Sequence, residues 1–333
     1  MYVAVRADGG PEIGYGHLVR TGALSSELLA RGHGVAYVTT TPAHVREVCP
    51  DGVDTVTISS REDPTPVREF TRDHADITVL DSYLADAMYQ QQLREATPLV
   101  VVADDTRHRI SADVLVNGNL YASDLEYNVI GSEPEWCLGP EYLLLRQEIT
   151  EYASKDPPWR DPPSRAIVTM GGSDVAELTP IVIRAFEGFS LCVDAIVGPG
   201  FSIEQEAEIK EVAEDVSTDV RVVRDPNNLP ERMFQADLAV ATASTTTYEL
   251  LALGTPIISI PVIDNQEPIA NSLRDRNAAT VLDRGSGQTS FRRGINEYSS
   301  NKTLRVQRRN LGKKIVDGQG TTRVLNLVSD VGI

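Results

Sequence analysis

The sequence predicts an α/β protein built from two halves, each a parallel β-sheet covered by helices. Three observations support this fold class. Short β-branched runs alternate with stretches of helical periodicity along the first half, a proline-rich break follows, and the same alternation then starts again. At 333 residues the chain also exceeds the usual size of one domain, so two hydrophobic cores are expected.

The first half contains a regular series of apolar runs and helical stretches. Strands are expected at residues 2–7, 34–40, 53–59, 77–81 and 98–103. Helices are expected at residues 17–30, 42–49, 66–74 and 85–96. Strands that alternate with helices in this way form a parallel sheet with both faces covered.

A proline-rich segment separates the two halves. Residues 155–163 include Pro157, Pro158, Pro162 and Pro163, which suppress regular structure and stiffen the backbone. Strands are then expected at residues 165–170, 191–197, 220–223, 238–241 and 256–260, with a helix near 177–188. We therefore expect an N-terminal domain at 1–150, a linker at 151–164, a C-terminal domain at 165–333 and a cleft between the domains.

The charge balance argues against a general nucleic-acid-binding protein. Asp and Glu outnumber Lys and Arg by 48 to 31, which gives a net charge of −17, whereas phosphate neutralisation needs a basic surface. One hypothesis for this acidity is adaptation to a high-salt cytoplasm, where ions screen the self-repulsion. The last 44 residues are nevertheless basic, with nine Lys and Arg against three acidic residues. A solvated helical face that pairs with the acidic body explains this segment better than nucleic-acid contact.

The sequence also indicates where in the cell the protein is located. It begins with a strand pattern instead of a targeting signal, and no apolar run approaches the roughly 20 residues of a membrane helix. Cys49, Cys137 and Cys192 are widely spaced and form neither a disulfide framework nor a metal-ligand pattern. We expect a cytoplasmic protein without membrane insertion, and no pattern in the sequence predicts its oligomeric state.

One histidine stands where a glycine-rich loop becomes a helix. The stretch Gly14-Tyr15-Gly16-His17-Leu18-Val19-Arg20 follows the first strand, and a helix start offers unpaired N–H groups and a field that favours anions. His17 can therefore face a ligand. The alternative is that the glycines only make a tight turn and His17 caps the helix.

The second half offers glycines and hydroxyl groups after its strands. Gly171-Gly172-Ser173-Asp174 can cradle a phosphate, although it lacks the lysine of a P-loop and can equally be a structural turn. Residues 242–250 crowd hydroxyl side chains at a strand-to-helix junction, which suits a diphosphate, and Glu249 lies one turn further on, within reach of ribose hydroxyls. The alternative is an ordinary N-cap at Ser244 or Thr245.

Three further polar groups follow predicted strands. Asn265 and Gln266 present amides that can bond sugar hydroxyls or acetamido groups. Asp81 ends one strand, and Asp104 with Asp105 ends the next; paired carboxylates can bind a metal or exchange a proton, and aspartates also cap helices and stabilise turns. All these groups fall at the carboxyl ends of strands, where open α/β sheets bind ligands.

Taken in order, these motifs resemble the nucleotide-sugar hydrolases of the pseudaminic acid pathway, which act on UDP-2,4-diacetamido-2,4,6-trideoxy-β-L-altropyranose. Those enzymes are GT-B proteins, with two Rossmann-like domains facing a cleft, related to the peptidoglycan GlcNAc transferase. The resemblance runs nearly end to end and rests on the motifs at residues 6–8, 13–20, 80–83, 104–105, 138–142, 145–146, 170–174, 248–256, 265–266 and 316–320.

The resemblance implies a role for each candidate residue. His17 would be the general base that activates water, which imidazole chemistry allows near neutral pH. The C-terminal half would hold UDP, and no cofactor or metal is implied. The nucleotide-binding residues would be Gly172, Ser173, Ser244, Thr245 and Glu249. The substrate-binding residues would be Asp8, Gly16, Tyr83, Asn265 and Gln266.

The expected function is therefore hydrolysis of a UDP-linked diacetamido-trideoxy sugar, with release of UDP and free sugar, in nonulosonic acid or surface-glycan synthesis. Two alternatives remain open from the sequence. A GT-B glycosyltransferase would admit an acceptor hydroxyl in place of water, and a noncatalytic protein would bind the nucleotide sugar without turnover. The exact sugar and nucleotide are not specified by these motifs.

Overall fold

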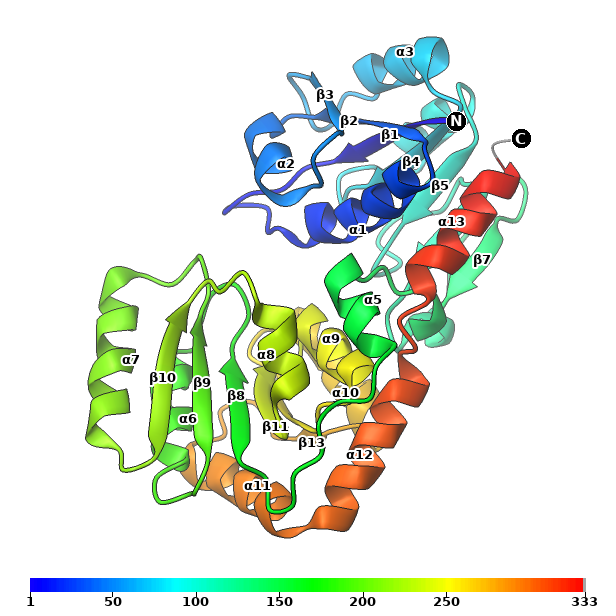
Figure 1. Cartoon of the computed structure of the whole chain (residues 1–333). Coiled ribbons are helices and arrows are strands. Elements are labelled where there is room, and N and C mark those ends of the chain that lie inside the picture. Colours follow the sequence, from blue (N-terminus) through cyan, green and yellow to red (C-terminus); the bar gives the residue numbers. More distant parts are fainter. Residues whose placement is uncertain (332–333) are drawn as a thin grey trace. The chain divides into compact units, whose positions relative to one another are not determined.

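The computed structural model describes residues 1–331 and divides into two compact units (Figure 1). The first unit contains Met1–Gln147 together with the segment that starts at Gly318, and the second contains Glu148–Asp317. The chain therefore passes between the units twice. No helix within residues 1–331 is both long enough and apolar enough to cross a membrane.

The first unit is built on a seven-stranded parallel sheet with the strand order β3-β2-β1-β4-β5-β6-β7. Buried β-branched residues such as Val3, Val5 and Val79 fill its central strands, as expected for a sheet covered on both faces. The strands are β1 (Tyr2–Ala7), β2 (Gly34–Thr39), β3 (Asp54–Thr57), β4 (Ile77–Asp81), β5 (Leu99–Val102), β6 (Val114–Asn117) and β7 (Glu135–Leu138).

Helices cover both faces of this sheet. The helices that connect its strands are α1 (Gly16–Ala30), α2 (Pro42–Val48), α3 (Thr65–His74) and α4 (Ala87–Arg94), and the short 3-10 helices are η1 (Ala122–Asp124) and η2 (Pro140–Tyr142). Leu24 and Leu28 of α1 pack in the same core as Val324 and Val328 of α13 (Gly320–Val331). The last described helix therefore completes the core of the first unit.

The second unit has a six-stranded parallel sheet with the order β10-β9-β8-β11-β12-β13. Its strands are β8 (Arg165–Thr169), β9 (Cys192–Val197), β10 (Asp219–Arg224), β11 (Leu238–Thr242), β12 (Ile257–Ile260) and β13 (Thr280–Val281). Its helices are α5 (Gln147–Ala153), α6 (Leu178–Ala185), α7 (Ile203–Asp215), α8 (Leu229–Gln235), α9 (Thr245–Leu253), α10 (Glu267–Asp275), α11 (Gln288–Ser300) and α12 (Lys302–Ile315), with the 3-10 helix η3 (Asp264–Gln266).

The observed elements agree with the sequence pattern except in three respects. All ten predicted strands are present, within one or two residues at most ends, and β6, β7 and β13 are additional. The expected linker at 151–164 overlaps α5, and its remaining part lies in the second unit. The segment from Gly318 groups with the first unit, although a C-terminal domain was expected to run to residue 333.

The proline-rich segment lies along α12, beside which it runs in Figure 1. Arg309 donates hydrogen bonds to the carbonyl oxygens of Pro157 and Pro158, and Arg305 forms a 3.0 Å ion pair with Asp161. The Trp159 ring lies within cation–π distance of both arginines. Part of the basic C-terminal segment thus holds the chain where it enters the second unit.

Candidate active site

Each sheet has one point where the order of its strands reverses. In the first unit the chain adds β2 and β3 on one side of β1 and β4 to β7 on the other, so the reversal lies between β1 and β4. In the second unit the reversal lies between β8 and β11. Open parallel sheets bind ligands outside the carboxyl ends of the strands at such points. The two candidate sites are described separately below.

The glycine-rich loop after β1 is folded back on itself. The amide of Gly14 donates to the carbonyl of Gly10 at 2.7 Å, and Gly14 has a φ of 88°, a conformation that favours glycine. The amide of Gly9 donates to Thr41 Oγ1 at 3.1 Å. Helix α1 then begins at Gly16, so the predicted sequence of strand, loop and helix is confirmed.

His17 lies in the first turn of α1 and only 6% of its surface is exposed. Its Nδ1 atom is 2.6 Å from Oδ1 of Asp81, the last residue of β4. The parallel register explains this contact, because Asp81 is paired with Ala7 at the end of β1, just before the loop that leads to His17. A carboxylate at Nδ1 favours the tautomer that carries its proton there, which leaves the lone pair on Nε2.

Arg20 connects the histidine pair to a second carboxylate. Its Nε and Nη2 atoms donate to the two oxygens of Asp81, each at 2.6 Å, and its Nη1 atom donates to Oδ1 of Asp104 at 2.5 Å. Burial raises the pKa of Asp81, but the charge of Arg20 and the hydrogen bonds from Arg20 and His17 outweigh this effect and hold the pKa below its usual value. Asp81 is therefore ionised at neutral pH.

Tyr83 closes this network on the exposed side. Its hydroxyl donates to Oδ2 of Asp104 at 2.5 Å, and its ring meets the His17 ring edge to face at a centroid distance of 4.5 Å. Asn119 donates to Oδ1 of Asp104 at 3.2 Å. Burial raises the pKa of Asp104, but the charge of Arg20 and the hydrogen bonds to the carboxylate outweigh this effect and lower the pKa to about 2. We call His17, Arg20, Asp81, Tyr83 and Asp104 the His17 network.

Asp8 and Gly16 lie on the same loop as His17 but differ in their surroundings. Asp8 is buried in a 2.7 Å ion pair with Arg6, and it accepts hydrogen bonds from Thr39 and from the amide of Thr40. It therefore joins the ends of β1 and β2. Gly16 is exposed at the start of α1, and no atom lies within 4 Å of the position that a Cβ would occupy.

In the second unit, two glycine loops touch at the carboxyl ends of β8 and β9. The amide of Gly200 donates to the carbonyl of Gly172 at 2.8 Å. A Cβ on Gly198 would lie 2.6 Å from the carbonyl oxygens of both Gly171 and Gly172, so only glycine fits there. Gly172 and Ser173 are exposed. The backbone contacts with Gly198 and Gly200 fix the shape of this loop, and Gly172 and Ser173 remain accessible to solvent.

Asp174 ends this glycine loop and caps helix α6. Its buried carboxylate accepts hydrogen bonds from the amides of Leu178 and Thr179 and from the Thr179 hydroxyl. The carboxylate therefore fixes the helix that follows the loop. The geometry favours a structural role for Asp174 and leaves Gly172 and Ser173 as the candidate ligand contacts of this loop.

The hydroxyl-rich junction after β11 places Ser244 at the N-cap of α9. Ser244 has extended backbone there, but its side chain does not cap the helix; its Oγ instead accepts a 3.3 Å hydrogen bond from Thr242. Thr245 is exposed in the first turn, and Glu249 is half-buried one turn further along α9. The N-terminal amides of α9 therefore lie next to hydroxyl groups that do not cap them.

Asn265 and Gln266 lie in η3, after β12. The Oε1 atom of Gln266 accepts a 2.9 Å hydrogen bond from the amide of Val262, which fixes the shape of the loop. Asn265 is exposed. Like Ser173 and Ser244, both residues follow the carboxyl end of a strand of the second sheet.

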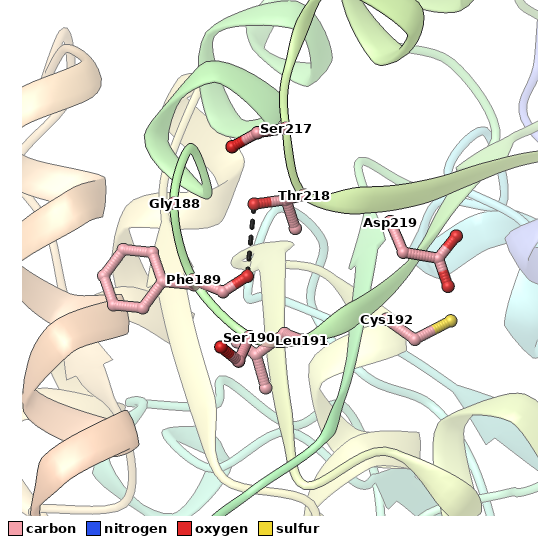
Figure 2. A pocket seen from close by; sticks show the side chains of 8 residues that line it. All are labelled: Gly188, Phe189, Ser190, Leu191, Cys192, Ser217, Thr218 and Asp219. Carbon is pink, nitrogen blue, oxygen red and sulfur yellow. Dashed lines mark hydrogen bonds between the residues drawn. The ribbon is translucent and has the colours of Figure 1, made fainter.

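An open hollow lies at the opposite end of the second sheet. Figure 2 shows this open pocket of about 410 Å³, which is formed by the connections that lead into β9 and β10. The Thr218 hydroxyl donates to the carbonyl of Phe189 within it at 3.2 Å. None of the predicted site residues lines this hollow. A smaller pocket of about 30 Å³ adjoins the His17 network and is lined in part by Tyr83, Asp104 and Arg107.

Sequence reasoning missed Arg20 and Asn119 as members of the first site and left Asp104 open. Arg20 follows His17 by three residues, a spacing that places two helical side chains on one face, and this was the available signal. Asp104 and Asp105 do not act as a pair, because Asp105 forms a 2.6 Å ion pair with Arg107. Among the side chains of residues 1–329, no cluster of three or more His, Cys, Asp or Glu has a geometry suited to a metal.

The sequence is similar to those of several known proteins. No family model matches the chain. The spore coat polysaccharide biosynthesis protein SpsG of Bacillus subtilis (strain 168) is 24% identical over 342 residues, which cover 99% of this chain and 98% of that protein. The UDP-2,4-diacetamido-2,4,6-trideoxy-beta-L-altropyranose hydrolase of Campylobacter jejuni (strain NCTC 11168) is 21% identical over 82% of this chain and 96% of that enzyme.

The fold matches that of a protein whose structure has been solved. MurG of Acinetobacter baumannii superposes with a TM-score of 0.71 at 14% identity, over 99% of both chains. The predicted fold class is therefore confirmed: two Rossmann-like units of the GT-B type. The resemblance to the nucleotide-sugar hydrolase, first indicated by the motifs, is also confirmed as a similarity over most of the chain.

Proposed function

We propose that this chain hydrolyses a UDP-linked diacetamido-trideoxy sugar at its anomeric carbon, with His17 as the general base. The observation that supports this proposal most strongly is the 2.6 Å contact between His17 Nδ1 and the buried Asp81 carboxylate. A histidine oriented in this way has the lone pair of Nε2 available for a proton. The similarity to the Campylobacter jejuni hydrolase supports the choice of substrate.

In the proposed reaction, a water molecule attacks the anomeric carbon while His17 Nε2 takes one of its protons. The bond between the anomeric carbon and the diphosphate oxygen breaks, and UDP leaves with the electron pair. The other water proton remains on the new hydroxyl group of the sugar. Asp81 stabilises the imidazolium that forms, because its carboxylate is ionised and already hydrogen-bonded to the ring.

The second unit would hold the nucleotide. Neutral donors at the start of α9 suit a diphosphate because a helix N-terminus favours negative charge. Ser244, Thr245 and the glycine loop at Gly172 and Ser173 would contact the phosphates, and Glu249 would accept hydrogen bonds from the ribose. Tyr83, Gly16 and Asp8 would border the sugar on the first unit.

Asn265 and Gln266 would complete the contacts of the second unit with the diphosphate or the sugar. An exposed asparagine side chain offers both a donor and an acceptor, as an acetamido group requires. Gln266 would act mainly through the loop that it stabilises, because its Oε1 atom is bonded to Val262.

The MurG-like fold favours a second candidate function, transfer of the sugar to an acceptor hydroxyl. One experiment separates the two. Purified protein is incubated with UDP-linked diacetamido sugars, and UDP and free sugar are measured without any acceptor. Release of both in equal amounts supports hydrolysis. Turnover that starts only when a glycan or lipid acceptor is added supports transfer, and UDP binding without turnover under either condition contradicts both.

A further inference from the structure

Arg20 occupies a position that the base mechanism above does not use. Its guanidinium donates twice to Asp81 and once to Asp104, and only 18% of the side chain is exposed. Its Nη2 atom lies 3.2 Å from Nδ1 of His17. Because an arginine remains charged at any ordinary pH, a permanent positive charge lies beside the histidine.

The charges around His17 can be followed group by group. The groups that face its ring are Asp81 from the end of β4, Arg20 from α1 and Tyr83 from the connection between β4 and α4. Asp104, which follows β5, acts on the ring through Arg20 and Tyr83. Two carboxylates therefore surround one guanidinium and one imidazole.

A buried carboxylate needs a cation, and two candidates touch Asp81. If His17 alone balanced Asp81, the imidazole would hold its second proton and Nε2 would carry hydrogen instead of a lone pair. Arg20 instead supplies a charge that is bound to both oxygens of Asp81. The histidine is then free to donate one proton from Nδ1 and remain neutral.

We propose that Arg20 is a positioning residue that keeps His17 neutral, with its proton on Nδ1 and Nε2 ready to accept a proton. Asp104 opposes this effect, because its carboxylate pairs with Arg20 and offsets part of the Arg20 charge. Tyr83 ties Asp104 to the exposed rim of the site through its hydroxyl. The inference rests on the proposed function, which needs a neutral histidine as the base.

The charge control can be measured without substrate. The ring nitrogens of His17 are followed by ¹⁵N NMR in a pH titration of the wild-type protein and of the Arg20→Met, Arg20→Lys and Asp104→Asn variants. Arg20→Met is expected to keep the imidazole doubly protonated at a pH where the wild type has already lost the second proton, because the neighbouring positive charge is removed. Arg20→Lys should restore most of the wild-type titration, because it returns the charge.

Asp104→Asn tests the direction in which the His17 titration moves. Loss of a negative charge next to Arg20 should move the titration of His17 to lower pH, opposite to the effect of Arg20→Met. Arg31→Met is the matched control: Arg31 follows the last turn of α1 and pairs with Glu27 on the surface. It removes the same charge from the far end of the same helix, about 20 Å from His17, and should leave the His17 titration unchanged.

Activity provides the second measurement. The acid limb of the UDP-release profile should move to higher pH in Arg20→Met, with a loss of about tenfold or more at pH 7 that is recovered at higher pH. A His17 titration that is the same in Arg20→Met and wild type, or that moves in one direction in both Arg20→Met and Asp104→Asn, would overturn the inference.

The two proposals fail in distinguishable ways. If the NMR titrations shift as expected but no nucleotide sugar is hydrolysed, charge control by Arg20 stands and the proposed reaction is wrong. If UDP is released by the wild type and the titrations do not shift, the reaction stands and the role of Arg20 is wrong. Circular dichroism of each variant checks that it is folded. If Arg20→Met is unfolded, the His17 titrations of Arg20→Lys and Asp104→Asn are compared with that of the wild type instead.

Discussion

The carboxyl edges of the two sheets differ in the side chains that their strand reversals present. In the first unit, ionised groups lie within hydrogen-bond distance of one another around a buried histidine. In the second unit, the reversal between β8 and β11 presents glycine backbone and uncharged hydroxyl groups. The same architecture thus presents charged side chains in one unit and uncharged donors in the other.

The difference follows from what each site is proposed to bind. A proton transfer needs charges that are fixed before the reaction, and burial together with mutual pairing fixes them. A diphosphate already carries its charge, so neutral N–H and O–H donors at a helix start are enough to hold it. If this division is correct, substitutions in one unit should change turnover and substitutions in the other should change nucleotide affinity.

The strongest test of this division is His17→Ala. Removal of a general base is expected to lower the turnover number about 10²–10⁴-fold, because water must then lose its proton to solvent. The affinity for UDP, measured by isothermal titration calorimetry, should remain within about twofold, since no proposed nucleotide contact is changed. Turnover near that of the wild type would show that His17 is not the base.

The second test is a substitution in the second unit, which should change the affinity for UDP. In Gly198→Ala the new Cβ would clash with the carbonyl oxygens of Gly171 and Gly172 at 2.6 Å, so the glycine loop must move. Loss of a hydrogen bond from this loop to a charged phosphate is expected to weaken UDP binding by about 10–100-fold. Gly287→Ala is the control, because no atom lies within 4 Å of its Cβ position. Equal UDP affinity in the two variants would remove this loop from the nucleotide site.

Local signals made the elements of the first site predictable. The apolar run of β1, the glycines after it and the helical spacing from His17 are all contained within the first thirty residues, and strand, loop and helix follow as expected. The strand end at Asp81 was also predicted to the residue. Such features depend on neighbours in the chain, which a single sequence shows directly.

Contacts between distant residues were not predictable in the same way. The bonds from Arg20 to Asp81 and Asp104 require β4 to lie beside β1 and β5 beside β4, an order set by the whole sheet. Likewise, the apolar face of α13 indicates that the helix packs on a core, but not on which one. The tight approach of Gly320 to the Leu143 backbone fixes its place in the first unit and has no sequence signature.

A third test concerns Glu249, which is placed one turn into α9. Its carboxylate is proposed to accept hydrogen bonds from the ribose, so Glu249→Ala should weaken UDP binding about tenfold. Glu249→Gln keeps one acceptor oxygen, so its affinity for UDP should fall less than that of Glu249→Ala. Uridine 5′-diphosphate and its 2′,3′-dideoxy analogue provide the comparison: the analogue should bind wild type and Glu249→Ala about equally. If Glu249→Ala binds the analogue more weakly than the wild type does, the proposed contact between Glu249 and the ribose is wrong.

The smallest expected effect is on stability at low pH, and it should arise in the first unit. The pKa of Asp104 is lowered from 3.8 to about 2: burial raises it, but the charge of Arg20 and the bonds to the carboxylate lower it more. A group with a lowered pKa stabilises the fold above its unfolded value, and this contribution is lost as the pH falls through the folded value. The loss should therefore occur between about pH 4 and pH 2.

Thermal unfolding from pH 7 to pH 2 measures this contribution. Asp104→Asn should lower the melting temperature at pH 7 by roughly 2–6 °C and should show a shallower fall between pH 4 and pH 2 than the wild type does. Asp51→Asn, at an exposed position, serves as the control and should follow the wild-type curve. If the melting temperatures of Asp104→Asn and wild type fall in parallel between pH 4 and pH 2, the ion pair between Asp104 and Arg20 adds no acid-sensitive stability. The charges of the His17 network would then affect His17 and not the stability of the fold.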